Sequence, residues 1–265
     1  MRSLFSICFL LVLCSGHCQD LHKYIDTALL RQKQVKSFSI WKMEKDGKDG
    51  SLVESMYFHE DYRIDTLIYF QNESATRIKY ENYYTYKRGV LYEVICKKNG
   101  KPFKGVRYHF EGDKCVKRVH SKIGGSFDFV EGFSFYPDGK LLKKYTNNVS
   151  RKQMTSEIYQ YGKDNKLQLV QVKRDNVLIE RKVYLVSKME HKVRIINNSK
   201  VEIGIEEFKF ARGNQLSYYK LDRKGDFKEV KFEFYQNELV KKIFVNNSKS
   251  SQSPYYYEIE YAFFE

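Results

Sequence analysis

The chain has 265 residues, of which 47 are lysine or arginine and 33 are aspartate or glutamate, so its formal net charge is +14. A charge of this size favours anionic partners over cationic ones. After residue 20 the sequence has no apolar stretch long enough for a membrane-spanning helix, which excludes the class of helical membrane proteins.

The first 18 residues have the pattern of a secretory signal peptide. Arg2 supplies the positive start, Leu4 to Leu13 form the apolar segment, and a short stretch of small residues follows. We expect cleavage after Cys18 and a mature protein that is secreted or periplasmic. A lipoprotein is disfavoured, because neither Cys14 nor Cys18 follows a small residue.

Export decides which anionic partners are expected. Outside the cytosol nucleic acid is not expected, whereas lipid headgroups, acidic glycans and acidic proteins are. We therefore expect the partner to be an unknown protein or an anionic envelope polymer. Association with a membrane surface is also expected, without a transmembrane segment.

Two shorter regions precede the repeats. Residues 38–82 are rich in strand-forming residues and predict either irregular first strands or a degenerate repeat, and both interpretations stay open. Residues 19–37 predict one amphipathic helix with Asp20 as its N-cap, because apolar residues recur at helical spacing. These residues are Leu21, Tyr24, Ile25, Ala28, Leu29 and Val35.

Residues 83–265 repeat one block of 23 to 26 residues. Most blocks contain two aromatic residues separated by one residue, a turn, and a run in which apolar and polar residues alternate, and the block of Tyr184 departs from this because Lys182 replaces its first aromatic. A period of two is typical of a strand with one buried face, and repeats of this length predict a repeat architecture. The second aromatic, or its equivalent, occupies eight anchor positions: Tyr86, Phe110, Phe135, Tyr161, Tyr184, Phe210, Phe234 and Ile259.

Turn residues separate the expected strands. Arg88-Gly89 lies within a block and Asn99-Gly100 lies between blocks. Glycine and asparagine tolerate the positive φ of tight hairpins, and neighbouring hairpins satisfy each other's unpaired edges. The predicted fold is all-β, an extended or curled antiparallel meander of β-hairpins with one N-terminal helix. Curvature of the sheet, the helix or a partner would cover its aromatic face.

Two segments resemble the bacterial variant of the MORN repeat. They are GVRYHFEGDKCVKRV at Gly105 to Val119 and GFSFYPDGKLLKKY at Gly132 to Tyr145, each an aromatic strand, a turn and a lysine-rich return strand. The similarity covers roughly residues 83–247. It implies an extended sheet of hairpins used for interaction or scaffolding, as in antitoxin-like members, and it supplies no catalytic residues.

Motifs for catalysis are not found in the sequence. Ser39 with Lys42, and Ser217 with Lys220, have the spacing of a serine nucleophile and its lysine. Both pairs lie on expected strands, where residues three apart face opposite sides. We therefore expect a protein that is not an enzyme and has no cofactor.

His109, Cys115 and His120 lie within twelve residues and are candidate metal ligands. A two-residue turn after Glu111 would place His109 and His120 on one face, roughly 13 Å apart at strand rise, with Cys115 on the other face. No shared metal site is expected. Cys96 and Cys115 would both point to the apolar face toward opposite ends of their strands. Two buried thiols are favoured over a disulfide.

Lys143, Lys144, Lys241 and Lys242 occupy overlapping positions of the repeat, so we expect them to line a basic stripe that contacts an anionic partner. The predicted function is that of an exported, non-enzymatic binding or scaffold surface for a protein or an anionic envelope polymer.

Two alternatives stay open. The number of strands, the aromatic residues and the export signal also fit an outer-membrane β-barrel, although lysines interrupt the apolar band that lipid requires. A hydrolase would use surface carboxylates, of which Glu258 and Glu260 share a face.

Overall fold

The structure is a computed structural model. It describes residues 25, 27–43, 50–73, 76–123, 126–187, 189–211, 215–224, 226–248 and 255–264. The expected signal peptide at residues 1–18 lies outside the described residues, so its cleavage stays a prediction.

The described residues form one short helix and eighteen strands. The helix α1 spans Thr27–Gln32. The strands are 8 to 12 residues long. In chain order they are β1 (Val35–Met43), β2 (Ser51–Phe58), β3 (Ile64–Glu73), β4 (Thr76–Lys87), β5 (Val90–Lys98), β6 (Lys101–Glu111), β7 (Lys114–Lys122), β8 (Phe127–Phe135), β9 (Leu141–Asn148), β10 (Gln153–Tyr161), β11 (Leu167–Arg174), β12 (Val177–Val186), β13 (Glu190–Asn197), β14 (Glu202–Phe210), β15 (Leu216–Arg223), β16 (Asp226–Phe234), β17 (Val240–Asn247) and β18 (Tyr255–Phe263).

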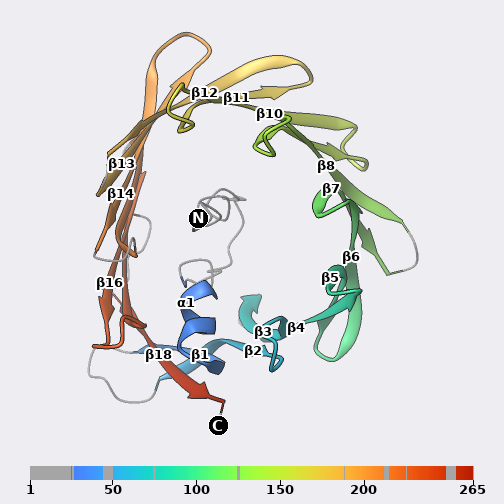
Figure 1. The fold of residues 1–265 in the computed structure, drawn as a ribbon, viewed down its shortest axis with the longest axis vertical. Coiled ribbons are helices and arrows are strands. Elements are labelled where there is room, and N and C mark those ends of the chain that lie inside the picture. Colours follow the sequence, from blue (N-terminus) through green and yellow to red (C-terminus); the bar gives the residue numbers. More distant parts are fainter. Residues whose placement is uncertain are drawn as a thin grey trace.

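The sheet closes into a barrel. Each strand pairs antiparallel with the next one along the chain, from β1 with β2 to β17 with β18. The first strand also pairs with the last, so that Ile40 lies opposite Ile259 and Phe38 lies opposite Tyr261. These pairings produce the closed ring of Figure 1.

The antiparallel meander of hairpins expected from the sequence is confirmed, but the expectation of an extended or curled sheet is corrected. Adjacent strands twist in one direction, which bends a long sheet back toward its own start. When β18 reaches β1, the two strands satisfy each other's backbone N–H and C=O groups. Closure therefore removes both free edges.

The N-terminal helix predicted at residues 19–37 ends earlier than expected. In the described part of the chain it spans only Thr27–Gln32. Gln34 has a φ of 56° and donates its N–H to the carbonyl of Arg31, which ends the helix. Val35 then begins β1 and is fully buried in the barrel wall. Val35, whose spacing predicted a place in the helix, therefore belongs to the sheet.

Residues 38–82 contain regular strands. They comprise most of β1, all of β2 and β3, and the first half of β4. Strands β2 and β3 form a hairpin joined by residues 59–63, and their pairing has one register shift, as in many of the later hairpins. This region thus adds to the ring in the same way as the repeats do.

Tight turns join the hairpins. Asn99 and Gly100 have φ values of 48° and 77°, the conformation that a two-residue hairpin turn requires. The Asn99 side chain accepts a hydrogen bond from the Lys79 N–H at 3.0 Å, and its own N–H donates to the Lys79 carbonyl at 2.8 Å. Asp175 makes the same two bonds with Met154. Asn99 thus ties the end of β5 to β4, and Asp175 ties the end of β11 to β10.

The apolar face of the sheet lines the interior. Helix α1 lies inside the ring in Figure 1, and its Leu30 belongs to one buried cluster with Phe38 and Ile40. Cross-strand pairing places all eight anchor residues on that same face. The core beside α1 is formed mainly by β1 to β3 and β13 to β18. There Ile243 and Tyr257 are fully buried.

Candidate binding surfaces on the two faces of the barrel

The number of strands sets the width of the interior. Barrels of about eight strands are filled by their own side chains, whereas roughly 16 to 18 strands leave an aqueous passage. With eighteen strands, this barrel is wide enough for helix α1 to lie inside it (Figure 1), and many inward side chains away from α1 are half-buried.

Strands β7, β8 and β9 place an ionic cluster on the inner wall. Its centre is Glu131, which is only 6% exposed. The Glu131 carboxylate lies 3.1 Å from Nε2 of His120, 3.0 Å from Nζ of Lys144 and 3.6 Å from the guanidinium of Arg118. The His120 ring also stacks on Phe129, with 3.8 Å between centroids. The cluster is therefore held in place by neighbours on three strands.

The surroundings of Glu131 keep it ionised. Burial alone would raise its pKa, but the hydrogen bond from His120 and the charges of Lys144 and Arg118 outweigh burial and lower the pKa to about 2. Nε of Arg118 is buried without a hydrogen-bond partner among the described residues. Within the cluster, one carboxylate thus faces two permanent cations, and a second carboxylate, Glu157, lies opposite Lys144 on β10.

A second polar place on the inner wall lies on β12 and β14. Tyr184 and Glu206 both pair with Val193 of the strand between them. Within the described part of the chain, neither the Tyr184 hydroxyl nor Oε2 of Glu206 has a hydrogen-bond partner. Burial raises the pKa of Glu206, and Lys182 lowers it only in part. Strands β10 and β11 lie between this polar site and the cluster around Glu131, which is on β7 to β9.

The outward face is charged. Cross-strand ion pairs join Lys192 to Glu207 at 3.0 Å and Lys242 to Glu258 at 2.9 Å. Lipid-facing surfaces of membrane barrels instead carry an apolar band about 25 Å tall. The outward ion pairs therefore suit contact with water.

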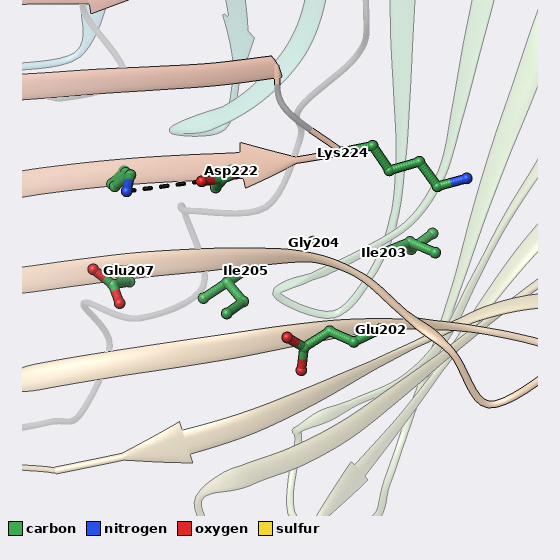
Figure 2. Close-up of a pocket in the computed structure, with 8 residues that line it drawn as sticks. Glu202, Ile203, Gly204, Ile205, Glu207, Asp222 and Lys224 are labelled. Carbon is green, nitrogen blue, oxygen red and sulfur yellow. Dashed lines mark ion pairs between the residues drawn. The ribbon is translucent and has the colours of Figure 1, made fainter.

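A cavity of about 370 Å³ lies on the outward face between β14 and β15 (Figure 2). Its carboxylates already have partners: Glu202 pairs with Arg194 at 2.5 Å, and Asp222 lies 3.8 Å from Lys220. In the described ranges, no group of three or more histidine, cysteine, aspartate or glutamate residues is placed to hold a metal ion.

The four lysines predicted to form a basic stripe do not lie together. Lys144 is buried on the inner wall beside Glu131, whereas Lys143 is exposed on the outward face. Lys241 and Lys242 lie on β17, eight strands away around the ring. The alternation of a strand separates neighbouring residues onto opposite faces.

The predicted register of the β6–β7 hairpin is corrected by a bulge. Phe110 pairs with Cys115 as expected, but a register shift next to His109 places Val106 opposite His120. His120 therefore faces inward and His109 outward, rather than both sharing one face.

Cys96 and Cys115 are both free thiols. Cys96 is buried and Cys115 is half-buried, on β5 and β7 respectively. Burial raises the pKa of each thiol. The expectation of a buried thiol is thus met at Cys96, whereas Cys115 is only half-buried.

The carboxylates considered for a hydrolase lie outward on β18 and have structural partners. Glu258 pairs with Lys242, and Glu260 accepts a hydrogen bond from the Trp41 indole at 2.9 Å. The Trp41 contact crosses the seam where the barrel closes.

Sequence reasoning missed Glu131 and Glu206. A usable signal was present, because each acid occupies an inward position of the period-two pattern. Glu131 stands between Phe129 and Phe133, and Glu206 stands two residues before Phe208. A charge among inward aromatic positions indicates a buried polar site.

These observations define the class: a closed, antiparallel, 18-stranded β-barrel with an aromatic and ionic inner wall and a charged outer wall. No helix among the described residues is long and apolar enough to span a membrane. No protein-family model and no curated protein matches the sequence.

Three solved structures show limited similarity to this chain. A porin-like protein from Bacteroides uniformis ATCC 8492 aligns with a TM-score of 0.48 at 6% identity, over 87% of this chain and 97% of that one. A chain of the TcdB2-TccC3-Cdc42 structure aligns with a TM-score of 0.41 at 8% identity, over 80% of this chain and 13% of that one. A chain of the TcdB2-TccC3 structure aligns with a TM-score of 0.31 at 7% identity, over 82% of this chain and 17% of that one. The resemblance to MORN-variant repeats stays a prediction.

Closure of the sheet into a ring changes which of the predicted functions the structure favours. A ring has no open sheet face and no free edge, so the structure favours the barrel architecture of the outer-membrane alternative over an open scaffold surface. The aromatic face that an open scaffold would present is turned inward.

Proposed function

We propose that this protein is an exported, non-enzymatic β-barrel that binds an acidic glycan in its interior. The observation that carries the proposal is the ionic cluster of Arg118, His120, Glu131 and Lys144 on the inner wall, with the aromatic rings of Phe129 and Phe133 beside it.

Burying the charged groups of this cluster costs free energy, which favours a functional role for them. Removing charged groups from water is expensive, and an outward position would keep them hydrated. Nε of Arg118 is a charged donor without a hydrogen-bond partner among the described residues, which suits an anionic group on a ligand. Half-buried inward aromatic rings such as Tyr108 and Phe133 offer flat apolar surfaces for the sugar rings.

Calorimetric titration tests the proposal directly. We expect oligogalacturonates, which are acidic, to bind, and neutral malto-oligosaccharides not to bind. Arg118→Gln should weaken binding by about tenfold or more, because it removes a charge partner from a partly desolvated site. Arg107→Gln is the matched control, since Arg107 faces outward and pairs with Glu93 at 3.2 Å.

Three results would overturn the proposal: no binding of the acidic oligosaccharide, equal binding of the neutral one, or equal loss in both arginine variants. Circular dichroism of each variant shows whether the barrel is folded, so a loss caused by unfolding is separated from a loss of contacts.

The second candidate is the outer-membrane β-barrel. The closed ring and strands of 8 to 12 residues favour it, since a transmembrane strand needs about 9 to 11 residues. It requires the outward ion pairs, such as Lys192 with Glu207, to lose their hydration in lipid. Light scattering separates the candidates. A monodisperse protein without detergent supports the aqueous barrel, and a protein that stays dispersed only in detergent supports the membrane barrel.

A further inference from the structure

The two rims of the barrel differ in charge. In an antiparallel ring, alternate turns lie at opposite ends of the strands. The six turns that join β5 to β6, β7 to β8, β9 to β10, β11 to β12, β13 to β14 and β15 to β16 therefore share one end. We call these turns, with the strand residues that border them, the basic rim.

The described residues of the basic rim include nine basic and three acidic residues. The opposite rim, counted in the same way over its described residues, has seven basic and eight acidic residues. The positive charge of the chain is thus concentrated at one end. The nine basic residues are Lys98, Lys101, Lys122, Arg151, Lys152, Arg174, Lys200, Arg223 and Lys224.

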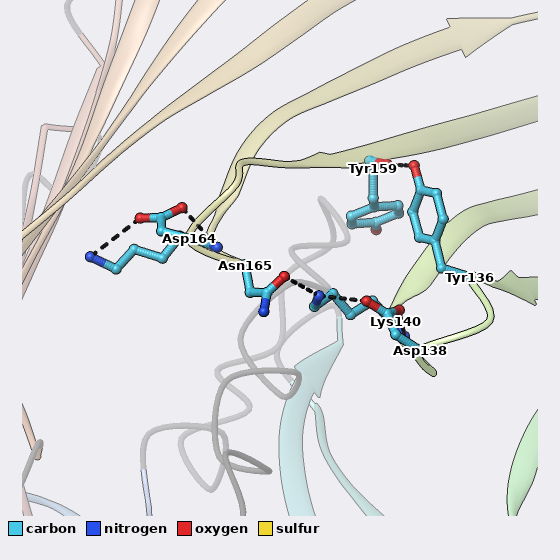
Figure 3. A network of polar contacts seen from close by, with 7 residues as sticks. Tyr136, Asp138, Lys140, Tyr159, Asp164 and Asn165 are labelled. Carbon is cyan, nitrogen blue, oxygen red and sulfur yellow. Dashed lines mark hydrogen bonds and ion pairs between the residues drawn. The ribbon is translucent and has the colours of Figure 1, made fainter.

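Ion pairing increases this difference. At the opposite rim, an aspartate two residues earlier neutralises the lysine of a turn: Asp138 lies 2.6 Å from Lys140, and Asp164 lies 3.6 Å from Lys166 (Figure 3). At the basic rim, seven of the nine cations form no ion pair with any described residue. These are Lys101, Lys122, Arg151, Lys152, Arg174, Lys200 and Lys224.

Large apolar side chains are exposed at the same rim. Five of them, on four turns, are between 48% and 63% exposed: Ile123, Phe127, Val149, Val177 and Val201. Basic residues adjoin them in the sequence, as Lys122 adjoins Ile123 and Lys200 adjoins Val201. Apolar residues exposed on successive turns mark an interaction surface.

The backbone holds these side chains in fixed positions. The N–H of Val149 donates to the carbonyl of Asp128 at 3.2 Å, and the N–H of Val201 donates to the Asn197 side chain at 2.9 Å. The turns are therefore tied to the barrel wall and present their apolar residues from one end of it.

We propose that the basic rim docks on an anionic lipid bilayer. The five apolar side chains enter the interfacial region, and the surrounding lysines and arginines contact the headgroups. Apolar side chains flanked by cations match the apolar and anionic layers of a bilayer. A soluble polyanion would use the cations but leave the apolar residues in water. The barrel then stands with one opening toward the membrane, which goes beyond binding in its interior.

Vesicle co-sedimentation of the purified protein tests the docking. Vesicles of phosphatidylcholine alone are compared with vesicles that also contain phosphatidylglycerol, at low and high salt. We expect binding to the anionic vesicles only, weakened by salt. Replacing all five apolar residues by serine should reduce binding by about tenfold or more. Replacing Lys122, Arg151, Lys152 and Lys200 by glutamine should do the same.

Matched variants at the opposite rim control for general effects. Val90→Ser with Met189→Ser, and Lys87→Gln with Arg88→Gln, change the same residue types in exposed positions. They should leave vesicle binding unchanged, and circular dichroism confirms that each variant is folded. Arg118→Gln should also bind vesicles normally, which separates docking from glycan binding in the interior.

Three results would overturn the docking proposal. The first is equal binding to neutral and anionic vesicles, or to neither. The second is equal loss at both rims. The third is binding of soluble polyphosphate as tightly as anionic vesicles with no effect of the five serine substitutions, which would identify the rim as a polyanion site.

Discussion

Ile40 of the first strand lies opposite Ile259 of the last strand, and the two side chains are 0% and 1% exposed. This pair closes the barrel from the inside. Outward from it, the Trp41 indole donates to Glu260 across the same seam. The wall is therefore continuous between residues 219 positions apart in the chain.

The seam should be sensitive to loss of apolar volume. Ile259→Ala removes buried methyl and methylene groups and should lower the free energy of unfolding by about 2 to 5 kcal/mol. Ala262→Ser, on the exposed outward face of the same strand, should change it by less than about 0.5 kcal/mol. Urea denaturation followed by circular dichroism measures both. Similar effects of the two substitutions would show that the seam is not packed as described.

The pKa of Glu131 predicts a pH dependence. Because its folded-state pKa is lowered to about 2 from the ordinary glutamate value of 4.5, the folded state is stabilised above pH 4.5. This stabilisation, up to about 3 kcal/mol for a shift of that size, should be lost as the pH falls from 4.5 toward 2. Unfolding free energies measured across this range check it.

Glu131→Gln provides the comparison for the pH measurement. It should be less stable at neutral pH, because Lys144 stays buried without its counter-charge. Its stability should fall less steeply between pH 4.5 and 2. Parallel pH profiles for the two proteins would contradict the assignment.

Two glycines separate backbone strain from packing. Gly100 has a φ of +77° and nothing lies within 4 Å of an added Cβ, so Gly100→Ala should destabilise by about 1 to 2 kcal/mol through the backbone alone. At Gly105 an added Cβ would make ordinary contacts of 3.7 and 3.8 Å, so Gly105→Ala should be neutral or stabilise by up to about 1 kcal/mol. Thermal unfolding measures the two variants. Equal losses would argue against the turn conformation at Gly100.

The thiols should be chemically quiet in the folded barrel. Burial raises the pKa of both Cys96 and Cys115, which lowers the thiolate fraction at neutral pH. Labelling with a thiol reagent should be slow, slowest at Cys96, and should become rapid after denaturation. A reducing agent should leave the melting temperature unchanged, and a large decrease would indicate a disulfide.

The repeated hairpins could be predicted because each anchor residue follows a local rule. Phe208, Phe210 and their cross-strand partners alternate with exposed charges, and turns such as Asn99-Gly100 have residues suited to positive φ. Closure could not be predicted in this way. Whether β18 meets β1 depends on twist summed over all strands, and no short segment contains that information.

The candidate site was less predictable than the fold. One bulge next to His109 reversed the expected relation between two histidines, and bulges leave little trace in sequence. The predicted basic stripe contained both Lys143 and Lys144. Adjacent residues of a strand point to opposite faces, so one of the two had to face inward. The partner of Lys144, Glu131, lies on another strand and became evident only with the register.

An engineered disulfide across the seam tests the closed ring most directly. Ser37 lies opposite Ala262 in the β1–β18 pairing, on the outward face. Ser37→Cys with Ala262→Cys, in a protein with Cys96 and Cys115 replaced by serine, should form an intramolecular disulfide in the monomer under mild oxidation. Ser39→Cys with Tyr256→Cys is the out-of-register control and should stay reduced, because Tyr256 pairs with Met43 instead. Complete intramolecular cross-linking of the first pair alone supports the barrel, whereas disulfide-linked dimers, or no cross-link, would contradict it.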